Sequence, residues 1–168
     1  MTMSESAITY RGTVYPWQCD HMGHMNVMWY AAKFDEASWQ FLATLGLTAS
    51  YFREQGVGMV AIEQHTEYKR ELLAGDTVTI RSTVNDLKDK TLRLIHEMKN
   101  EQTGQIAALT TIVGLHIDTT SRRSLRLPEH ARARAVRVIS RSADSACAPL
   151  DYQSDSSSFS ERRELPFY

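Results

Sequence analysis

The sequence predicts a single α+β domain in which one long helix lies across an antiparallel sheet of about five strands. Apolar residues recur at helical spacing from Trp29 to Leu45, and four strand-like segments joined by short turns follow. The chain has 168 residues, of which 42% are hydrophobic, and this suits one domain with a closed core. The helix is therefore expected to cover one face of the sheet.

The first two elements are a short strand and the long helix. Residues 9–15 are rich in aromatic and β-branched side chains and end before Pro16, which has no amide hydrogen for a strand ladder. A polar loop follows. The helix has Asn26 as its expected N-cap, and Gly46 lies just past its end, where glycine is favoured.

The remaining elements are four strands and a short helix. Turn signals at Gly75-Asp76, at 88–90 and at 100–104 separate four strand-like segments. The connections between these segments are short enough for an antiparallel meander. The expected strands are residues 59–68, 76–87, 91–99 and 105–118, and a short helix is expected over residues 128–138.

These elements divide the chain into three parts. We expect residues 1–8 to be a flexible N-terminus and residues 9–138 to form the domain. Residues 139–168 are Ser-rich and poor in aliphatic side chains, so we expect a tail with little fixed structure.

Composition argues against several classes of partner. The net charge is -1 and the pI is about 6.6, so the basic surplus that nucleic acids or anionic membranes attract is missing. No apolar run reaches the roughly 20 residues of a membrane span, and we expect a cytoplasmic protein. Cys19 and Cys147 do not form a disulfide framework, and His21 and His24 lack further ligands for a metal site. No metal and no cofactor are expected.

The loop before the helix concentrates the residues that can carry chemistry. A helix N-terminus presents unpaired N–H groups and partial positive charge, which can hold a carbonyl and stabilise an oxyanion. Asp20 could act there as a nucleophile or as a general base on water, and the sequence leaves both roles open. A purely structural interpretation has equal weight, because Asp, Asn and Gly commonly pair with backbone groups in tight loops.

A resemblance adds to this interpretation. The run from Trp17 to Tyr30, WQCDHMGHMNVMWY, continues into Asp35-Glu36-Ala37 and resembles the signature of the 4-hydroxybenzoyl-CoA thioesterase family of hot-dog proteins. The Gly75-Asp76 turn is also similar, and the resemblance covers residues 8–138. The Trp-x-x-Asp-x-x-Gly-His-Met variant is similar to betainyl-CoA thioesterases. The resemblance implies a hot-dog fold, with the sheet wrapped around the central helix.

The resemblance also implies roles for individual residues. Asp20 corresponds to the catalytic aspartate, and the backbone N–H of Val27 corresponds to the donor that polarises the carbonyl. His24 and Asn26 fall where relatives line the site.

For the other candidate substrate-binding residues, a purely structural role is the alternative interpretation. Lys88 and Lys90 match the place where relatives bind the CoA nucleotide, but exposed turn lysines are common. Glu63 could be a second carboxylate beside a neighbouring subunit's site, although an outward-facing strand residue is favoured. The rings of Trp17, Trp29, Tyr30 and Trp39 are expected in the core, with contact to a quaternary ammonium group as the alternative.

The function that these residues favour is hydrolysis of a small acyl-CoA, such as a betainyl or aromatic ester, to the free acid and CoA. A non-catalytic acyl-CoA binding module on the same fold is the alternative. No G-x-S-x-G elbow, P-loop or Rossmann fingerprint is present. The resemblance implies a homodimer or a dimer of dimers, that is a homotetramer. The acyl group remains open, as does acyl carrier protein instead of CoA.

Overall fold

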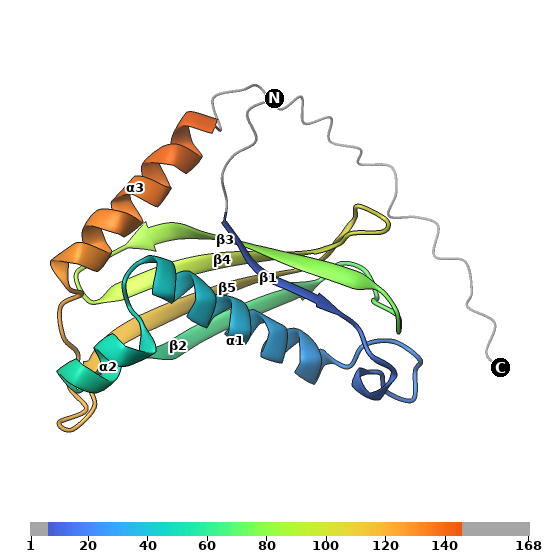
Figure 1. Ribbon diagram of the computed structural model, residues 1–168, viewed down its shortest axis with the longest axis horizontal. Coiled ribbons are helices and arrows are strands. Elements are labelled where there is room, and N and C mark those ends of the chain that lie inside the picture. Colours follow the sequence, from blue (N-terminus) through green and yellow to red (C-terminus); the bar gives the residue numbers. More distant parts are fainter. Residues whose placement is uncertain (1–6, 146–168) are drawn as a thin grey trace.

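A computed structural model describes residues 7–145, and Figure 1 shows how their elements are arranged. These residues form five strands, three α-helices and one short 3-10 helix at Pro16–Gln18. The strands are β1 (Ala7–Thr13), β2 (Val57–Tyr68), β3 (Thr77–Leu87), β4 (Thr91–Asn100) and β5 (Ile106–Asp118). The helices are α1 (Val27–Thr44), α2 (Ala49–Gln55) and α3 (Glu129–Ser145).

The five strands form one antiparallel sheet in the order β1-β3-β4-β5-β2. Short turns join β3, β4 and β5 into a meander, but the predicted meander of four strands is wrong for β2, which pairs with β5 and not with β3. β1 and β2 therefore take the two edges. The long helix α1 lies across one face of the sheet (Figure 1). The predicted α+β hot-dog arrangement, a sheet around one central helix, is confirmed.

α1 buries one stripe of its surface against the sheet. Tyr30, Phe34, Ala37 and Phe41 recur at intervals of four and three residues, and each is at most 4% exposed. Burial of one large apolar side chain contributes roughly 1.5–3 kcal/mol to folding. The helix is therefore held mainly by this stripe, and its N-terminus is fixed relative to the end of β1.

The middle strand β4 alternates as the sequence predicts, with Leu92, Leu94, His96 and Met98 buried and their neighbours partly exposed. His96 joins three elements, because its Nδ1 lies 2.6 Å from the Ser82 hydroxyl on β3 and its Nε2 lies 3.0 Å from the Ser38 hydroxyl on α1. Burial lowers the pKa of His96 to about 4. The imidazole is therefore neutral at physiological pH.

Two helices differ from the sequence prediction. No element was predicted between Gly46 and residue 59, but the segment before Gly56 forms α2, in which the Thr48 hydroxyl accepts from the Tyr51 N–H and caps the start. α3 continues past residue 138 to Ser145, because Val138 and Ile139 still pack against the core. Most of the expected tail lies outside the described residues.

Candidate active site

The loop between β1 and α1 has a fixed shape. The Asp20 N–H donates to the His24 carbonyl oxygen at 3.1 Å, and Cys19 pairs with Met25 in an isolated β-bridge. Met25 is 1% exposed, and its N–H donates to the Leu72 carbonyl oxygen at 2.7 Å. The loop is thus anchored in the core and tied to the segment before β3.

Asp20 is oriented by two hydrogen bonds. Its Oδ1 accepts from the Met22 N–H at 2.9 Å, and its Oδ2 accepts from the Asn26 side-chain amide at 3.0 Å. The Met22 N–H contributes most to lowering the pKa of the Asp20 carboxyl below its usual value, and Asn26 and the two nearby histidines add to this effect. The carboxylate is ionised at neutral pH, as both a nucleophile and a general base require.

Asn26 connects this carboxylate to the helix. Its side-chain oxygen accepts from the Met28 N–H at 3.0 Å, which confirms the predicted N-cap. The other half of the same amide donates to Asp20. One side chain therefore fixes both the helix start and the carboxylate.

Val27 is the first residue of α1, and its N–H has no acceptor among residues 7–145. The unpaired N–H groups of a helix start carry partial positive charge. A carbonyl oxygen placed against this N–H would gain a hydrogen bond that strengthens as negative charge develops on it. The loop thus places an ionised carboxylate and a free backbone donor near the same helix end.

A cavity of about 400 Å³ opens beside this helix start, although Asp20 is not among its lining residues. His24 lines it, is partly buried and lies 3.8 Å from the Glu71 carboxylate. The wall also includes Val27 and two basic residues that follow β2, Lys69 and Arg70. Lys69 was not among the candidates predicted from sequence, because nothing local indicates that the end of β2 meets the start of α1.

The aromatic residues divide between core and surface. Tyr30 is buried, which raises the pKa of its hydroxyl to about 12, and Trp29 packs against the same core cluster. The expectation of a core position was wrong for Trp17 and Trp39, which are 68% and 46% exposed. Trp17 stacks on Tyr15 instead, with ring centroids 4.4 Å apart.

Three charged candidates lie away from Asp20 within one chain. Glu63 is exposed on β2 and forms an ion pair with Arg93 at 3.8 Å, as an outward-facing strand residue can. Lys88 and Lys90 follow the far end of β3, whose first residue, Thr77, is near the loop. A strand of this length spans about 35 Å, so these lysines are remote from Asp20 of the same chain.

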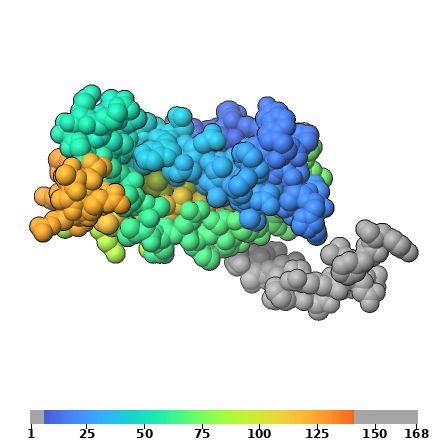
Figure 2. Space-filling model, turned by 90° about the horizontal axis from the view of Figure 1, so that it is seen from below, coloured from blue at the N-terminus to red at the C-terminus, as the bar shows by residue number. Residues whose placement is uncertain are grey.

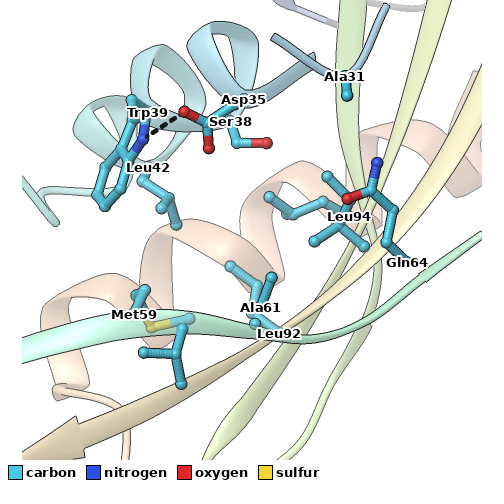
Figure 3. Close-up of a pocket in the computed structure, with 13 residues that line it drawn as sticks. Ala31, Asp35, Ser38, Trp39, Leu42, Met59, Ala61, Gln64, Leu92 and Leu94 are labelled. Carbon is cyan, nitrogen blue, oxygen red and sulfur yellow. Dashed lines mark hydrogen bonds between the residues drawn. The ribbon is translucent and has the colours of Figure 1, made fainter. Parts of the chain in front are cut away.

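A second cavity, of about 100 Å³, lies between the middle of α1 and the strands β2, β4 and β5 (Figure 3). Figure 2 shows α1 and β2 side by side with a hollow between them. Asp35 and Trp39 line this cavity, one helical turn apart. The sequence contained the i, i+4 spacing of these residues but not the strand that faces them. The lining is Ala31, Asp35, Ser38, Trp39, Leu42, Met59, Val60, Ala61, Gln64, Leu92, Leu94, Ile112 and Gly114.

No helix within residues 7–145 combines the length and the apolar character that a membrane span needs. Within the same range, no three His, Cys, Asp or Glu side chains come together as metal ligands.

The sheet around one central helix defines the class of protein, which is the hot-dog fold. A family model described as the Thioesterase-like superfamily matches residues 14–135, and the chain belongs to this family.

Curated relatives are similar at modest identity. The chain is 27% identical over 122 residues to the betainyl-CoA thioesterase of Pseudomonas aeruginosa, a match that covers 73% of this chain and 77% of that protein. It is 32% identical over 109 residues to the L-carnitine dehydrogenase/betainyl-CoA thioesterase of Agrobacterium fabrum. That match covers 65% of this chain but only 22% of the longer protein.

Solved structures share the fold. A hypothetical protein of Staphylococcus aureus, solved in complex with CoA, superimposes with a TM-score of 0.76 at 24% identity, covering 81% of this chain and 86% of that one. The 1,4-dihydroxy-2-naphthoyl-CoA thioesterase of Synechocystis gives a TM-score of 0.69 at 16% identity, covering 77% of this chain and 95% of the other.

Proposed function

We propose that this protein hydrolyses a small acyl-CoA to the free acid and CoA, with Asp20 as the reacting carboxylate. The observation that carries this proposal is the pairing of Asp20 with Asn26, which holds an ionised carboxylate beside the free N–H of Val27. The names of the relatives support an acyl-CoA substrate, with a betainyl or an aromatic acyl group as the candidates.

The Val27 N–H polarises the thioester carbonyl in either course of reaction. As a nucleophile, Asp20 attacks the carbonyl carbon, the C–S bond breaks, and CoA leaves as a thiolate that takes up a proton. Water then hydrolyses the mixed anhydride. As a general base, Asp20 takes a proton from the water that attacks the carbonyl directly. A mass increase on Asp20 after rapid quenching of a single turnover distinguishes the nucleophilic course.

The exposed edge of the sheet supports a homodimer. Residues 61–65 of β2 are all exposed, and a bulge between Ala61 and Glu63 interrupts the alternation of side chains between the two faces. An uncovered edge strand of this kind is a template for pairing with another chain. Antiparallel pairing of two β2 strands about a two-fold axis makes a closed dimer. Sedimentation equilibrium is expected to give the mass of two chains, or of four for a dimer of dimers, and a monomer would contradict this.

We assign the CoA nucleotide to basic residues at the end of the sheet where the Asp20 loop lies. Lys69 and Arg70 line the cavity beside the helix start of the same chain. Antiparallel pairing of β2 strands also reverses the direction of the partner's sheet. The turn that holds Lys88 of the partner subunit and Lys90 of the partner subunit therefore lies toward the same end as the Asp20 loop. The phosphates of CoA can interact with either pair.

The first test is free-thiol release from betainyl-, aromatic and short-chain acyl-CoA esters, with native protein and with Asp20→Asn. The variant is nearly isosteric but lacks the ionised oxygen, so we expect kcat to fall at least about 1000-fold. Circular dichroism and thermal melting control for folding. Binding without turnover of any ester by the native protein would identify a non-catalytic acyl-CoA binding module instead.

A further inference from the structure

The cavity between α1 and β2 combines aliphatic walls with one unbalanced charge. Leu42, Leu92 and Leu94 contribute to its apolar lining, while Asp35 lies on the helix side (Figure 3). The Ser38 hydroxyl is already engaged, because it donates to the Phe34 carbonyl oxygen at 2.8 Å and contacts the buried His96. Asp35 therefore supplies the only formal charge in the lining.

The surroundings of Asp35 leave its charge unneutralised. Its Oδ2 accepts from the Trp39 indole N–H at 3.1 Å, and the Trp39 ring packs edge to face against Phe52, with centroids 6.0 Å apart. Among the described residues, no lysine, arginine or histidine forms an ion pair with Asp35. The carboxylate is thus held in place by an aromatic neighbour and not by a cation.

A quaternary ammonium group fits this combination. Such a cation has no N–H to donate, so it is recognised by opposite charge, by aromatic rings and by contact of its methyl groups with apolar side chains. The cavity of about 100 Å³ is small, and this favours a short acyl head group over a long acyl chain.

The distance between Val27 and Asp35 bears on whether both residues of one chain can contact the same acyl group. Asp35 lies eight residues beyond Val27 on α1, which is about 12 Å along the helix axis. In a betainyl group only one methylene separates the cation from the thioester carbonyl, so a carbonyl held at Val27 keeps the cation away from Asp35 of the same chain.

The direction of the β2 strands in a dimer brings the small cavity of one chain toward the Asp20 loop of the other. Met59 and Ala61, from the first half of β2, line the cavity, whereas Lys69, just after β2, lines the cavity beside the helix start. The small cavity and the Asp20 loop therefore lie toward opposite ends of one sheet. Pairing of β2 strands about a two-fold axis places the small cavity of each chain toward the end that carries Asp20 of the partner subunit.

We infer that this cavity is the acyl subsite and that Asp35 selects acyl groups that carry a positive charge, with Trp39 as the aromatic wall. The inference rests on the proposed thioesterase function and on the β2-paired dimer. It assigns the charge preference to Asp35.

The test compares two esters of matched shape. Betainyl-CoA carries a trimethylammonium group, and 3,3-dimethylbutyryl-CoA carries the neutral tert-butyl group in the same place. Each is assayed for thiol release with native protein, with Asp35→Asn and with Glu36→Gln. Asp35→Asn can still accept from Trp39 but has lost the charge. Glu36→Gln removes the same charge from the neighbouring position, which is exposed like Asp35 but does not line the cavity.

We expect native protein to prefer betainyl-CoA, and Asp35→Asn to lower kcat/KM for that ester about 10-fold or more because a charge in a partly enclosed site is lost. The neutral ester should change less than about 3-fold, and Glu36→Gln should leave the ratio between the esters unchanged. An equal effect of Asp35→Asn on both esters, or an unchanged ratio, would overturn the inference.

Failure of the proposed function is recognised separately. Asp20→Asn should abolish turnover of both esters, and turnover that survives in this variant contradicts the catalytic assignment whatever Asp35 does. Calorimetric titration of both esters into Asp20→Asn measures the charge preference in binding alone. Equal affinity for the two esters there would also overturn the role of Asp35.

Discussion

The start of α1 and its middle use polar groups in opposite ways. At the start, both oxygens of Asp20 are hydrogen-bonded, and Asn26 joins the carboxylate to the helix cap. In the middle, Asp35 accepts one hydrogen bond from Trp39 and has no ion-pair partner among the described residues. A reacting group needs a fixed direction, whereas a group that selects a charged ligand needs spare charge. Under the proposed function, the loop before α1 supplies the first group and the middle of α1 supplies the second.

The largest expected effect concerns the support beneath the middle of α1. The pKa of His96 is lowered from 6.5 to about 4 in the folded protein. Between these two pH values the imidazole is protonated in the unfolded chain but not in the folded chain. This contribution to stability is complete above pH 6.5 and declines as pH falls toward 4, by up to about 3 kcal/mol.

Thermal melts between pH 7 and 4.5 check this prediction, because the carboxylates with lowered pKa values contribute mainly below that range. We expect the decline in Tm to be shallower for His96→Gln than for native protein. The exposed His21→Gln is the matched control and should keep the native slope. Equal slopes for all three proteins would contradict a neutral buried His96.

The second prediction separates the two functions of Asn26. Asn26→Ala removes the cap and the contact with Asp20, so kcat should fall about 10- to 100-fold and stability by about 1 kcal/mol. Asn26→Ser can still cap the helix but is too short to reach Asp20. It should recover the stability and not kcat, as measured by denaturation and thiol release. Full recovery of kcat would show that Asp20 does not depend on this contact.

The third prediction locates the CoA nucleotide. Lys69→Ala combined with Arg70→Ala should raise KM for CoA esters about 5-fold, through the loss of phosphate contacts, and should spare N-acetylcysteamine thioesters that lack the nucleotide. Lys88→Ala combined with Lys90→Ala is the comparison. A larger increase in this second protein would place the nucleotide across the subunit interface.

The smallest effect is expected at Trp39. Trp39→Phe keeps an aromatic ring but removes the indole donor to Asp35, a single hydrogen bond worth about 1 kcal/mol. The preference for betainyl-CoA over 3,3-dimethylbutyryl-CoA should fall about 2- to 5-fold, less than in Asp35→Asn. A loss as large as that of Asp35→Asn would mean that the ring, and not the carboxylate, is the main determinant.

The parts that were predictable from sequence depend on local signals. Asn26 before an apolar repeat marks a helix start, and alternation from Leu92 to Met98 marks a strand buried on one face. α2 was not predicted, although Thr48 and Gly56 are residue types that commonly cap a helix, because the segment is short and has no buried residue.

The rest depends on contacts between distant segments. Asp35 acquires its place in a cavity from β2, β4 and β5, and no local pattern records which strands face a given helical turn. Trp17 and Trp39 were expected in the core because aromatic rings usually supply buried area, yet both are exposed.

The bare edge of β2 has a consequence for how activity depends on concentration. If each acyl group is bound between two subunits, the dissociated chain retains Asp20 but loses the complementary cavity. Catalytic rate per chain then follows the law of mass action, falling on dilution below the dissociation constant of the dimer. The amount of protein in the cell would itself set the fraction of working sites.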